Sequence, residues 1–455
     1  MLDVTRFLLK QGLSFRGHDE SSNSLNRGNF LELLQWYSQR NKEVSKVVNQ
    51  NAPGNNQMIS PAIQKDLTRA CASEITLSII EDIGNNVFSL MVDESRDILV
   101  KEQMGVVLIY VNKRGQVIER FLAIVHVSDT SYRSLKDAID ALFVKHGLSL
   151  SRLRGQGYDG TSNMRGEFNG LKSLILQENP YASYIHCFSH QLQLVIIAVA
   201  KSNFNASDFF NYVTMIVNTT GASCKRRDQL RQIEHDRIVA MLEGGDISTG
   251  SGKNQETNLV RPGDIRWGSH YLTLGRLLSM WPSVIQVLEN IYDDSSSFDS
   301  RGVAKSLIQK MENYEFVFML HLMKMILGMT NELSLVLQQN DQNIVQAIMP
   351  EIKDNCMIGG RSRRRRLVIT NLHYYRVEIF YQVVDSVIQE MDTRFSEVGT
   401  ELLSFATASV ERVFSAMKTI KTDLRNRMGD EWMNDNLVVY IEKNIFSTIE
   451  NEQIL

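Results

Sequence analysis

Two aspartates stand directly after short apolar segments of the kind that form buried strands. Asp93 follows VFSLMV in VFSLMVDESRD, and Asp159 follows RLRGQGY in RLRGQGYDG. In a mixed sheet, neighbouring strand ends can hold two carboxylates within a few ångströms, where they repel unless a divalent cation lies between them. Phosphoryl-transfer enzymes bind paired metal ions in this way. The aspartates are therefore candidate metal ligands; alternatively, both belong to ordinary turns or helix N-caps.

The segments around these aspartates predict the sheet that would position them. Three β-rich runs follow Gly84 (VFSLMVDES, MGVVLIYVN and QVIERFLAIVHVS), and a turn at residues 113–115 joins the last two. They predict an antiparallel meander. A helix that ends at Gly147 and later strand-to-helix units complete the pattern of a mixed sheet covered by helices, so the predicted fold class is α/β. Recurring apolar stripes predict that residues 205–395 are almost wholly helical.

The composition is that of an ordinary globular protein. Of the 455 residues, 43% are hydrophobic and 22% charged, and the net charge is −3, so any basic surface must be local. The four cysteines are far apart and form no CxxC pair, which argues against a disulfide framework and favours a reducing compartment. The apolar run at residues 194–200 is too short to span a bilayer. We expect a soluble intracellular protein without a membrane partner.

Several distinctive blocks resemble the hAT (hobo/Activator) superfamily of DNA transposases, and most of all its plant branch of TTF-type or zinc-finger MYM-type-like proteins. The resemblance runs from about residue 5 to the end of the chain, but no cysteine precedes Cys71, so the N-terminal zinc finger of that branch is lacking. The blocks are MVDESRD, GQGYDGTSNMRGEFNG, HCFSHQLQLV, RWGSHY, ITNLHYYRVEIFY and ATASVERVFSAMKTIKTDLRNRM.

The resemblance implies a ribonuclease-H-like core interrupted by a large all-α insertion and followed by a dimerisation region. The expected division is an N-terminal helical segment (1–60), the first part of the core (61–204), the α-helical insertion (205–399), and a core-completing helix with the C-terminal dimerisation region (400–455).

The resemblance also implies the catalytic residues. Asp93 and Asp159 match the first two acids of an Asp-Asp-Glu triad, and Glu411 in ASVERVFS matches the third. Together they would hold two Mg²⁺ ions for DNA strand cleavage and transfer. A competing interpretation, from another functional class, is a catalytically inactive, domesticated or decayed transposase that acts as a dimerising nuclear interaction protein.

Two further motifs are assigned by the resemblance. Cys187 and His190 match a Cys-x-x-His motif beside the active site; no second pair lies at finger-like distance, so no zinc is expected, and a packed cysteine with a core histidine is the alternative. Trp267 matches a tryptophan that stacks on an unpaired base, with Arg266 beside it to contact a phosphate. A core tryptophan and a surface arginine are the alternatives.

Basic residues near the C-terminus are candidate DNA contacts. Lys418, Lys421 and Arg425, with Arg427, follow Glu411 at spacings that would line one helical face with phosphate-binding groups, although an ordinary charged face gives the same pattern. The RSRRRR run at 361–366 is interpreted as a nuclear-localisation signal, with DNA contact second.

The final segment carries an apolar stripe that needs a cover. Either the chain's own core or a second protomer could supply it, and the resemblance favours a homodimer or a higher assembly. The stripe consists of Trp432, Leu437, Val438, Tyr440, Ile441, Ile445 and Phe446. The expected partners are thus DNA, either transposon ends or non-specific sequence, and a second copy of the chain.

Overall fold

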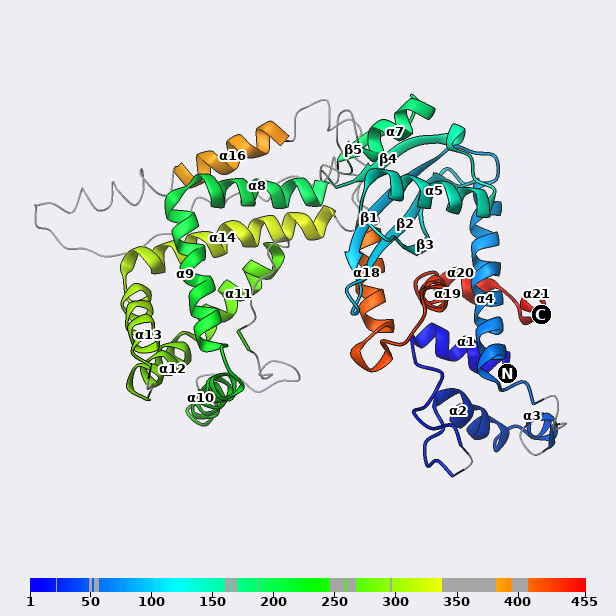
Figure 1. Cartoon of the computed structure of the whole chain (residues 1–455), viewed down its shortest axis with the longest axis horizontal. Helices are drawn as coiled ribbons and strands as arrows, with labels where there is room; N and C mark the ends of the chain where they lie inside the picture. Colours follow the sequence, from blue (N-terminus) through cyan, green and yellow to red (C-terminus); the bar gives the residue numbers. More distant parts are fainter. Residues whose placement is uncertain are drawn as a thin grey trace, which may run out of the picture. The chain divides into compact units, whose positions relative to one another are not determined.

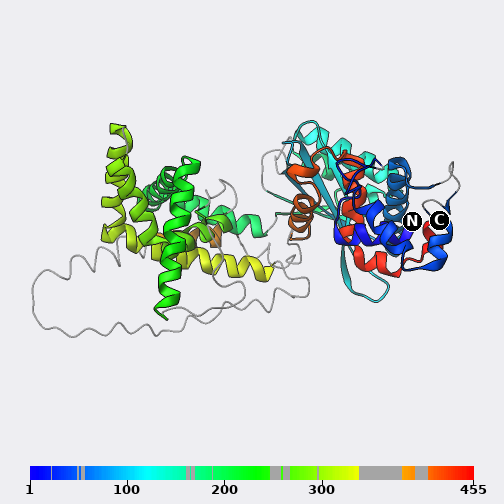
Figure 2. The ribbon, with the colours of Figure 1, turned by 90° about the horizontal axis from the view of Figure 1, so that it is seen from below.

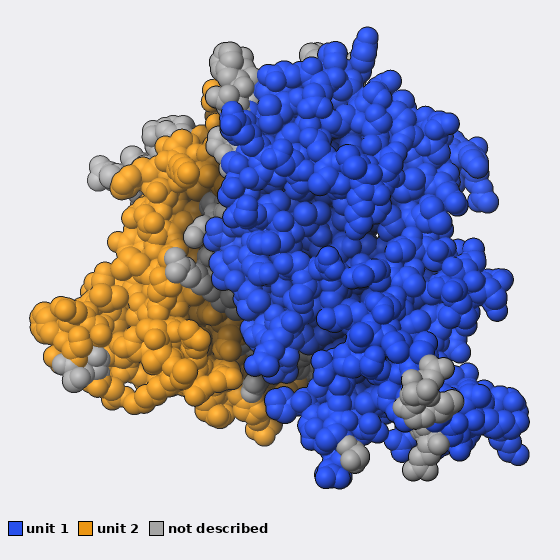
Figure 3. Space-filling view, turned by 45° about the vertical axis from the view of Figure 1, so that its right-hand side comes forward, with its two compact units in different colours: residues 1–188, 405–455 blue, residues 189–404 orange. Residues whose placement is uncertain are grey.

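The computed structural model of the chain divides into two compact units (Figure 1, Figure 2). Unit 1 comprises residues 1–188 and 405–455, and unit 2 comprises residues 189–404 (Figure 3). The structure describes all residues except 22, 49–50, 53–56, 160–163, 165–169, 187, 246–257, 260–266, 295–296, 338–381 and 395–407, and the side chains of Glu411, Trp267 and several other helix residues are also not described. No helix among the described residues is both long and apolar enough to cross a membrane.

Unit 1 is built around a five-stranded mixed sheet. Its strands are β1 (Phe88–Arg96), β2 (Glu102–Val111), β3 (Val117–His126), β4 (Leu153–Tyr158) and β5 (Ser183–His186), in the order β3-β2-β1-β4-β5 (Figure 1). β1, β2 and β3 form an antiparallel meander, whereas β1, β4 and β5 run parallel. The predicted mixed α/β sheet is therefore confirmed, including the turn at Gly115, which has a φ of 76°.

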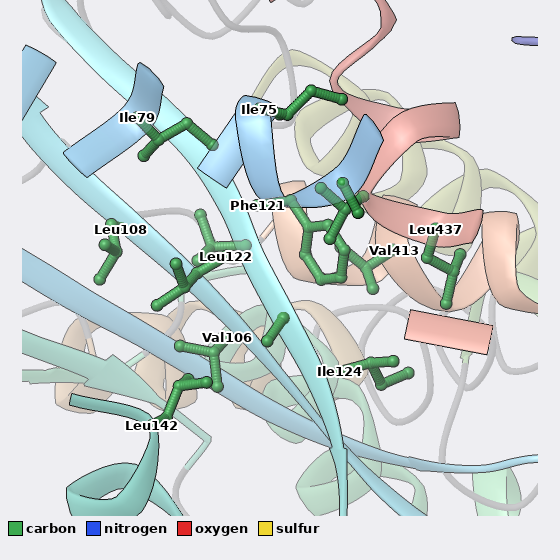
Figure 4. Packing of buried hydrophobic residues seen from close by; sticks show 14 of the residues in the cluster. Ile75, Ile79, Val106, Leu108, Phe121, Leu122, Ile124, Leu142, Val413 and Leu437 are labelled. Carbon is green, nitrogen blue, oxygen red and sulfur yellow. The ribbon is translucent and has the colours of Figure 1, made fainter. Parts of the chain in front are cut away.

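Helices from distant parts of the sequence cover this sheet. They are α4 (Pro61–Ile83), α5 (Tyr132–His146), α7 (Leu171–Glu178), α18 (Ala408–Ile420) and α19 (Asp430–Ile441). The side chain of Ser60 caps α4 by accepting the amide of Ile63, and α5 ends at Gly147 in the left-handed conformation, as predicted. Figure 4 shows Ile75, Phe121, Val413 and Leu437 in one buried cluster, which joins α4, β3, α18 and α19.

The free edge of β3 is closed by side chains from the C-terminal helices. The Phe121 amide donates to Glu442 Oε1 at 2.8 Å, and the Ile124 amide donates to Asn434 Oδ1 at 2.9 Å. Burial raises the pKa of Glu442, although the Phe121 amide and Arg120 act in the opposite direction. These bonds satisfy amides that an exposed edge strand would otherwise offer to another chain.

Replacing Glu442 with leucine should lower the free energy of unfolding by about 1–3 kcal/mol, because the buried Phe121 amide loses its acceptor. Urea denaturation measures this loss. Glu442→Gln is the matched control, since its side-chain carbonyl can still accept the bond, and it should be the more stable of the two variants. Equal stability of the two would show that the hydrogen bond contributes nothing.

The two ends of the chain pack together within unit 1. The N-terminal helices are α1 (Leu2–Gln11), α2 (Asn29–Ser38) and α3 (Lys42–Val47), and α20 (Lys443–Thr448) and α21 (Asn451–Ile454) end the chain. Arg6 donates to the Phe446 carbonyl at 2.9 Å and lies 4.4 Å from the centre of its ring. Both ribbon views show the two termini close to each other (Figure 1, Figure 2).

This packing covers the C-terminal apolar stripe. Leu437, Val438 and Phe446 are at most 1% exposed, and the remaining stripe residues are partly buried against the same core. The chain itself therefore supplies the cover, which was one of the two alternatives open from the sequence. The stripe no longer calls for a second protomer, and dimerisation remains a prediction.

Unit 2 has a separate core. Its described helices are α8 (Phe188–Ser202), which begins at the unit boundary, α9 (Phe204–Thr220), α10 (Cys224–Glu243), α11 (Trp267–Ser279), α12 (Trp281–Asp294), α13 (Phe298–Met311), α14 (Tyr314–Leu337) and α16 (Gln382–Arg394). Phe209, Leu274, Val287 and Phe316 are among the buried residues of that core. No strand occurs in the part of unit 2 that the structure describes, and in the sequence this unit separates the two segments of unit 1.

Candidate active site

Asp93 and Asp159 lie at the same end of two neighbouring parallel strands. Met91 of β1 pairs with Gly157 of β4, and each aspartate stands two residues beyond its member of that pair. The pairing of β1 with β4 ends at Met91 and Gly157, so both aspartates lie just beyond the last pair. A close approach of the two carboxylates stays a prediction. The Tyr184 hydroxyl also donates to the Asp159 carbonyl at 3.1 Å, which fixes the backbone at Asp159.

The environment of Asp93 differs from the predicted strand tip. β1 continues to Arg96 because it still pairs with β2, where Asp93 lies opposite Gly105. Only the pairing with β4 ends before Asp93. Asp93 therefore lies where β1 is still paired with β2 but is no longer paired with β4. Its Oδ1 accepts the Glu94 amide at 2.9 Å, which orients the carboxylate.

Helix α18 crosses the sheet at the level of Asp93. A methyl group on Gly105, the partner of Asp93 in β2, would lie 3.0 Å from Val410 Cγ1 and 3.3 Å from Phe414 Cζ. Glycine is needed here because the helix approaches the strand so closely. Glu411 follows Val410, so the helix that carries the third predicted acid packs over this part of the sheet. The Glu411 side chain is outside the description, and its distance to the aspartates remains a prediction.

Replacing Gly105 with valine should lower the free energy of unfolding by about 1–3 kcal/mol, because the added side chain collides with Val410 and Phe414. Chemical denaturation measures the change. The matched control is Gly302→Val, since a Cβ at Gly302 meets no atom within 4 Å, and its effect should stay within about 0.5 kcal/mol. If the two variants had the same free energy of unfolding, Val410 and Phe414 of α18 would not pack closely on Gly105 as described.

Glu94 is a third carboxylate near the two aspartates, and the sequence analysis did not select it. Burial raises the pKa of Glu94 to about 7, with further contributions from the negative charges of Asp159, Asp93 and Glu102. Its Oε1 is buried and has no hydrogen-bond partner among the described residues. Acidic charge is therefore concentrated at this end of the sheet. Such oxygen ligands fit a hard divalent cation such as Mg²⁺.

The described side chains alone do not complete a metal site. Among them, no group of three or more His, Cys, Asp or Glu residues lies close enough to hold an ion. Glu411 is not among the described side chains, so this finding leaves its role open. The triad of Asp93, Asp159 and Glu411 therefore stays a prediction.

Most other predicted site residues lie outside the description. Cys187, Arg266 and the run 361–366 are not described, and for Trp267 only the backbone is described, at the start of α11. His190 is half-buried in α8. Their predicted roles therefore stay as predictions.

The basic residues after Glu411 do not share one helical face, which corrects the prediction for Lys421 and Arg425. α18 ends at Ile420, and a short 3₁₀ turn (Asp423–Arg425) follows. Lys421 Nζ lies 2.7 Å from Asp97 Oδ2 in an ion pair whose side chains are 1% and 0% exposed, so it has no surface for a phosphate. Arg425 donates to the Gly12 carbonyl at 2.7 Å and is used to hold the N-terminal segment. Lys418 is exposed on α18.

The mixed sheet and its covering helices form an α/β domain, and the family model that this domain matches is described as RNase-like. Residues 1–170, which include both aspartates, match the family model described as DUF4371: ZMYM1/FAM200, RNase-like domain.

Two curated relatives are similar over most of the chain. Both are described as "52 kDa repressor of the inhibitor of the protein kinase". The protein from Homo sapiens is 21% identical over 443 residues, covering 87% of this chain and 56% of the relative. The protein from Mus musculus is 20% identical over 444 residues, covering 87% and 57%. The chain thus spans a little over half the length of these relatives. The similarities fit a domesticated hAT-like transposase family, while the plant branch remains a prediction.

Proposed function

We propose that this chain is a transposase-derived protein whose unit 1 cleaves DNA strands in the presence of Mg²⁺, with strand transfer as its ancestral reaction. The observation that carries the proposal is the register of β1 and β4, whose last pair lies two residues before both Asp93 and Asp159, in the region where helix α18 packs on the sheet. The match of residues 1–170 to an RNase-like domain supports it.

Each acid has a definite part in the proposed site. Asp93, Asp159 and Glu411 would hold two Mg²⁺ ions, which when bound activate the attacking oxygen and stabilise the leaving one. The Glu94 amide orients the Asp93 carboxylate, and the Tyr184 hydroxyl holds the Asp159 carbonyl. Lys418 stands seven residues after Glu411, about two helical turns, so it lies on the same side of α18 and would bind a DNA phosphate there.

Nicking of supercoiled plasmid DNA by the full chain tests the proposal. We expect nicked circles with Mg²⁺ and none with a chelator. Nicking that is unaffected by the chelator, or its complete absence with Mg²⁺, would contradict a metal-dependent cleavage activity.

The proposed setting for this activity is the nucleus. The basic run at 361–366 is of the kind that directs nuclear import, and the curated relatives are described as repressors. We therefore propose DNA, either transposon ends or non-specific sequence, and a second copy of the chain as partners.

The second candidate is a domesticated protein that has lost cleavage and acts as a dimerising nuclear interaction protein. The repressor description of the two relatives is the observation that favours it. Light scattering together with the nicking assay separates the candidates. A dimer without nicking supports the second candidate, whereas a monomer without nicking contradicts both.

A further inference from the structure

Two clefts of unit 1 lie next to each other along α4 and the start of α19. The first has a volume of about 1060 Å³ and lies between the loop after α1, the start of α4 and the segment before α19. The second has a volume of about 810 Å³ and lies between α4, the edge strand β3 and the end of α5. Both are lined by Arg69, Asp430, Glu431 and Asp435, so they are neighbours on one surface. We call the two clefts together the α4 trough.

Apolar side chains are exposed in both halves of the α4 trough. Leu424 in the first cleft is 98% exposed, and Leu77 in the second is 50% exposed. Trp432, half-buried, packs edge to face on Phe15 with ring centres 5.5 Å apart and also lines the first cleft. Exposed apolar residues rimmed by polar ones mark surfaces that bind other proteins.

The charges of the α4 trough are mixed. Lys65 and Arg427 are exposed in the first cleft and form no ion pair among the described residues. The centre carries three acids, of which Glu431 pairs with Arg69 and Asp430 with Lys101, each at 3.0 Å. A nucleic-acid strand would bring its phosphates against these acids, which is unfavourable. The free cations instead match one or two acidic side chains of a peptide.

A buried acceptor also favours a peptide. Gln64 is 1% exposed and lines the first cleft, and its Oε1 has no hydrogen-bond partner in the described part of the chain. Its amide nitrogen donates to the Ile59 carbonyl at 2.9 Å, which fixes the orientation of the amide. A peptide backbone offers N–H donors for such an oxygen, whereas a phosphodiester backbone offers none.

We propose that the α4 trough binds a peptide segment of another protein, one that carries an apolar anchor beside an acidic residue. The anchor packs on Leu424, and the neighbouring acidic side chain pairs with Lys65 or Arg427, all in the first cleft. Leu77 in the second cleft contacts another apolar residue of the same segment. This surface is separate from the strand-end aspartates, so the proposal stands whether or not the chain cleaves DNA.

The test is to select peptides on the full chain from a phage-displayed library of random sequences, and to measure their affinity by fluorescence anisotropy. We expect the selected peptides to share an aliphatic or aromatic residue next to Asp or Glu. The variant Leu77→Ser/Leu424→Ser should bind them at least about tenfold more weakly, which corresponds to about 1.4 kcal/mol. The matched control is Val144→Ser, since Val144 is 81% exposed on α5 and lies outside both clefts. It should bind as the wild type does.

Four outcomes would overturn the proposal. The first is a selection without a shared pattern, and the second is equal binding by the wild type and the double variant. The third is binding of single-stranded DNA that weakens in Lys65→Ala and Arg427→Ala while peptide binding does not, which would assign the trough to nucleic acid. The fourth is a dimer that the double variant converts to a monomer, which would assign it to a second copy of the chain.

Discussion

Replacing Asp93 with asparagine should lower Mg²⁺-dependent DNA nicking by more than about 100-fold, because loss of a group that merely supports a metal ligand already lowers activity 10- to 100-fold. Asparagine has the same shape as aspartate but no charge, so it withdraws one of the negative groups that would hold the ions. It also keeps a side-chain oxygen that can accept the hydrogen bond from the Glu94 amide, which Asp93 Oδ1 accepts at 2.9 Å in the wild type. The fold should therefore stay intact, and the loss should be confined to the chemistry.

The control for this experiment is Asp66→Asn, since Asp66 is an exposed aspartate on α4, away from the sheet end. It should nick DNA at the wild-type rate. Urea denaturation should give the same midpoint for the wild type and both variants. If Asp93→Asn nicks as fast as the wild type, the aspartate is not a catalytic ligand, and the observed nicking comes from elsewhere.

Replacing Lys421 with methionine should lower the free energy of unfolding by about 3–5 kcal/mol, since it leaves a buried carboxylate without its counter-charge. The Asp97 side chain is 0% exposed, and its Oδ2 lies 2.7 Å from Lys421 Nζ. Its Oδ1 accepts the amides of Leu99 and Lys101, so the same side chain shapes the turn between β1 and β2. The pair joins that turn to the end of α18. Lys418→Met, an exposed change on the same helix, should alter stability by less than about 0.5 kcal/mol.

A double variant separates the lost attraction from the unpaired charge. Asp97→Asn/Lys421→Met removes both charges and keeps an oxygen for the two turn amides, so it should be more stable than Lys421→Met alone. Chemical denaturation of the two variants measures the difference. A double variant as unstable as the single one would show that the isolated carboxylate is not the cause of the loss.

The same pair predicts a dependence of stability on pH. Burial tends to raise the pKa of Asp97, but the hydrogen bonds from Lys421 and from the backbone amides outweigh it, and the pKa lies below its usual value. A carboxylate whose pKa is lowered in the folded state stabilises the protein at pH values above its unfolded pKa of about 3.9. That stabilisation is lost as the pH falls through the folded-state pKa. As the pH falls below about 4, stability should therefore fall less steeply in Asp97→Asn than in the wild type. Parallel curves would contradict this.

The sheet could be predicted because its strands carry local signals. The run GVVLIYV in β2 is rich in β-branched residues and is almost wholly buried, as a central strand requires. The left-handed end of α5 was predictable from Gly147, since glycine adopts that conformation without strain. These features depend on residues that are close together in the sequence.

The features that were missed depend on contacts between distant segments. No glycine or proline lies between Ile420 and Gly429, so the chain gives no glycine or proline signal that α18 ends at Ile420. Lys421 is buried because it pairs with Asp97, more than 300 residues away in the sequence. Glu94 was missed because what distinguishes it is its burial and the nearby charges of Asp159 and Asp93, which depend on the folded structure and not on the local pattern. The C-terminal stripe predicted a buried face, but a stripe does not indicate whether the cover comes from its own chain or another.

The central claim is that Glu411 joins Asp93 and Asp159 around bound divalent ions. Titration with Mn²⁺, followed by electron paramagnetic resonance, measures that binding directly in the wild type, in Glu411→Gln and in the control Asp66→Asn. We predict that Glu411→Gln binds Mn²⁺ at least about tenfold more weakly than the other two proteins, since metal affinity falls by that much even when only a supporting group is lost. Equal affinity in all three proteins would contradict the claim.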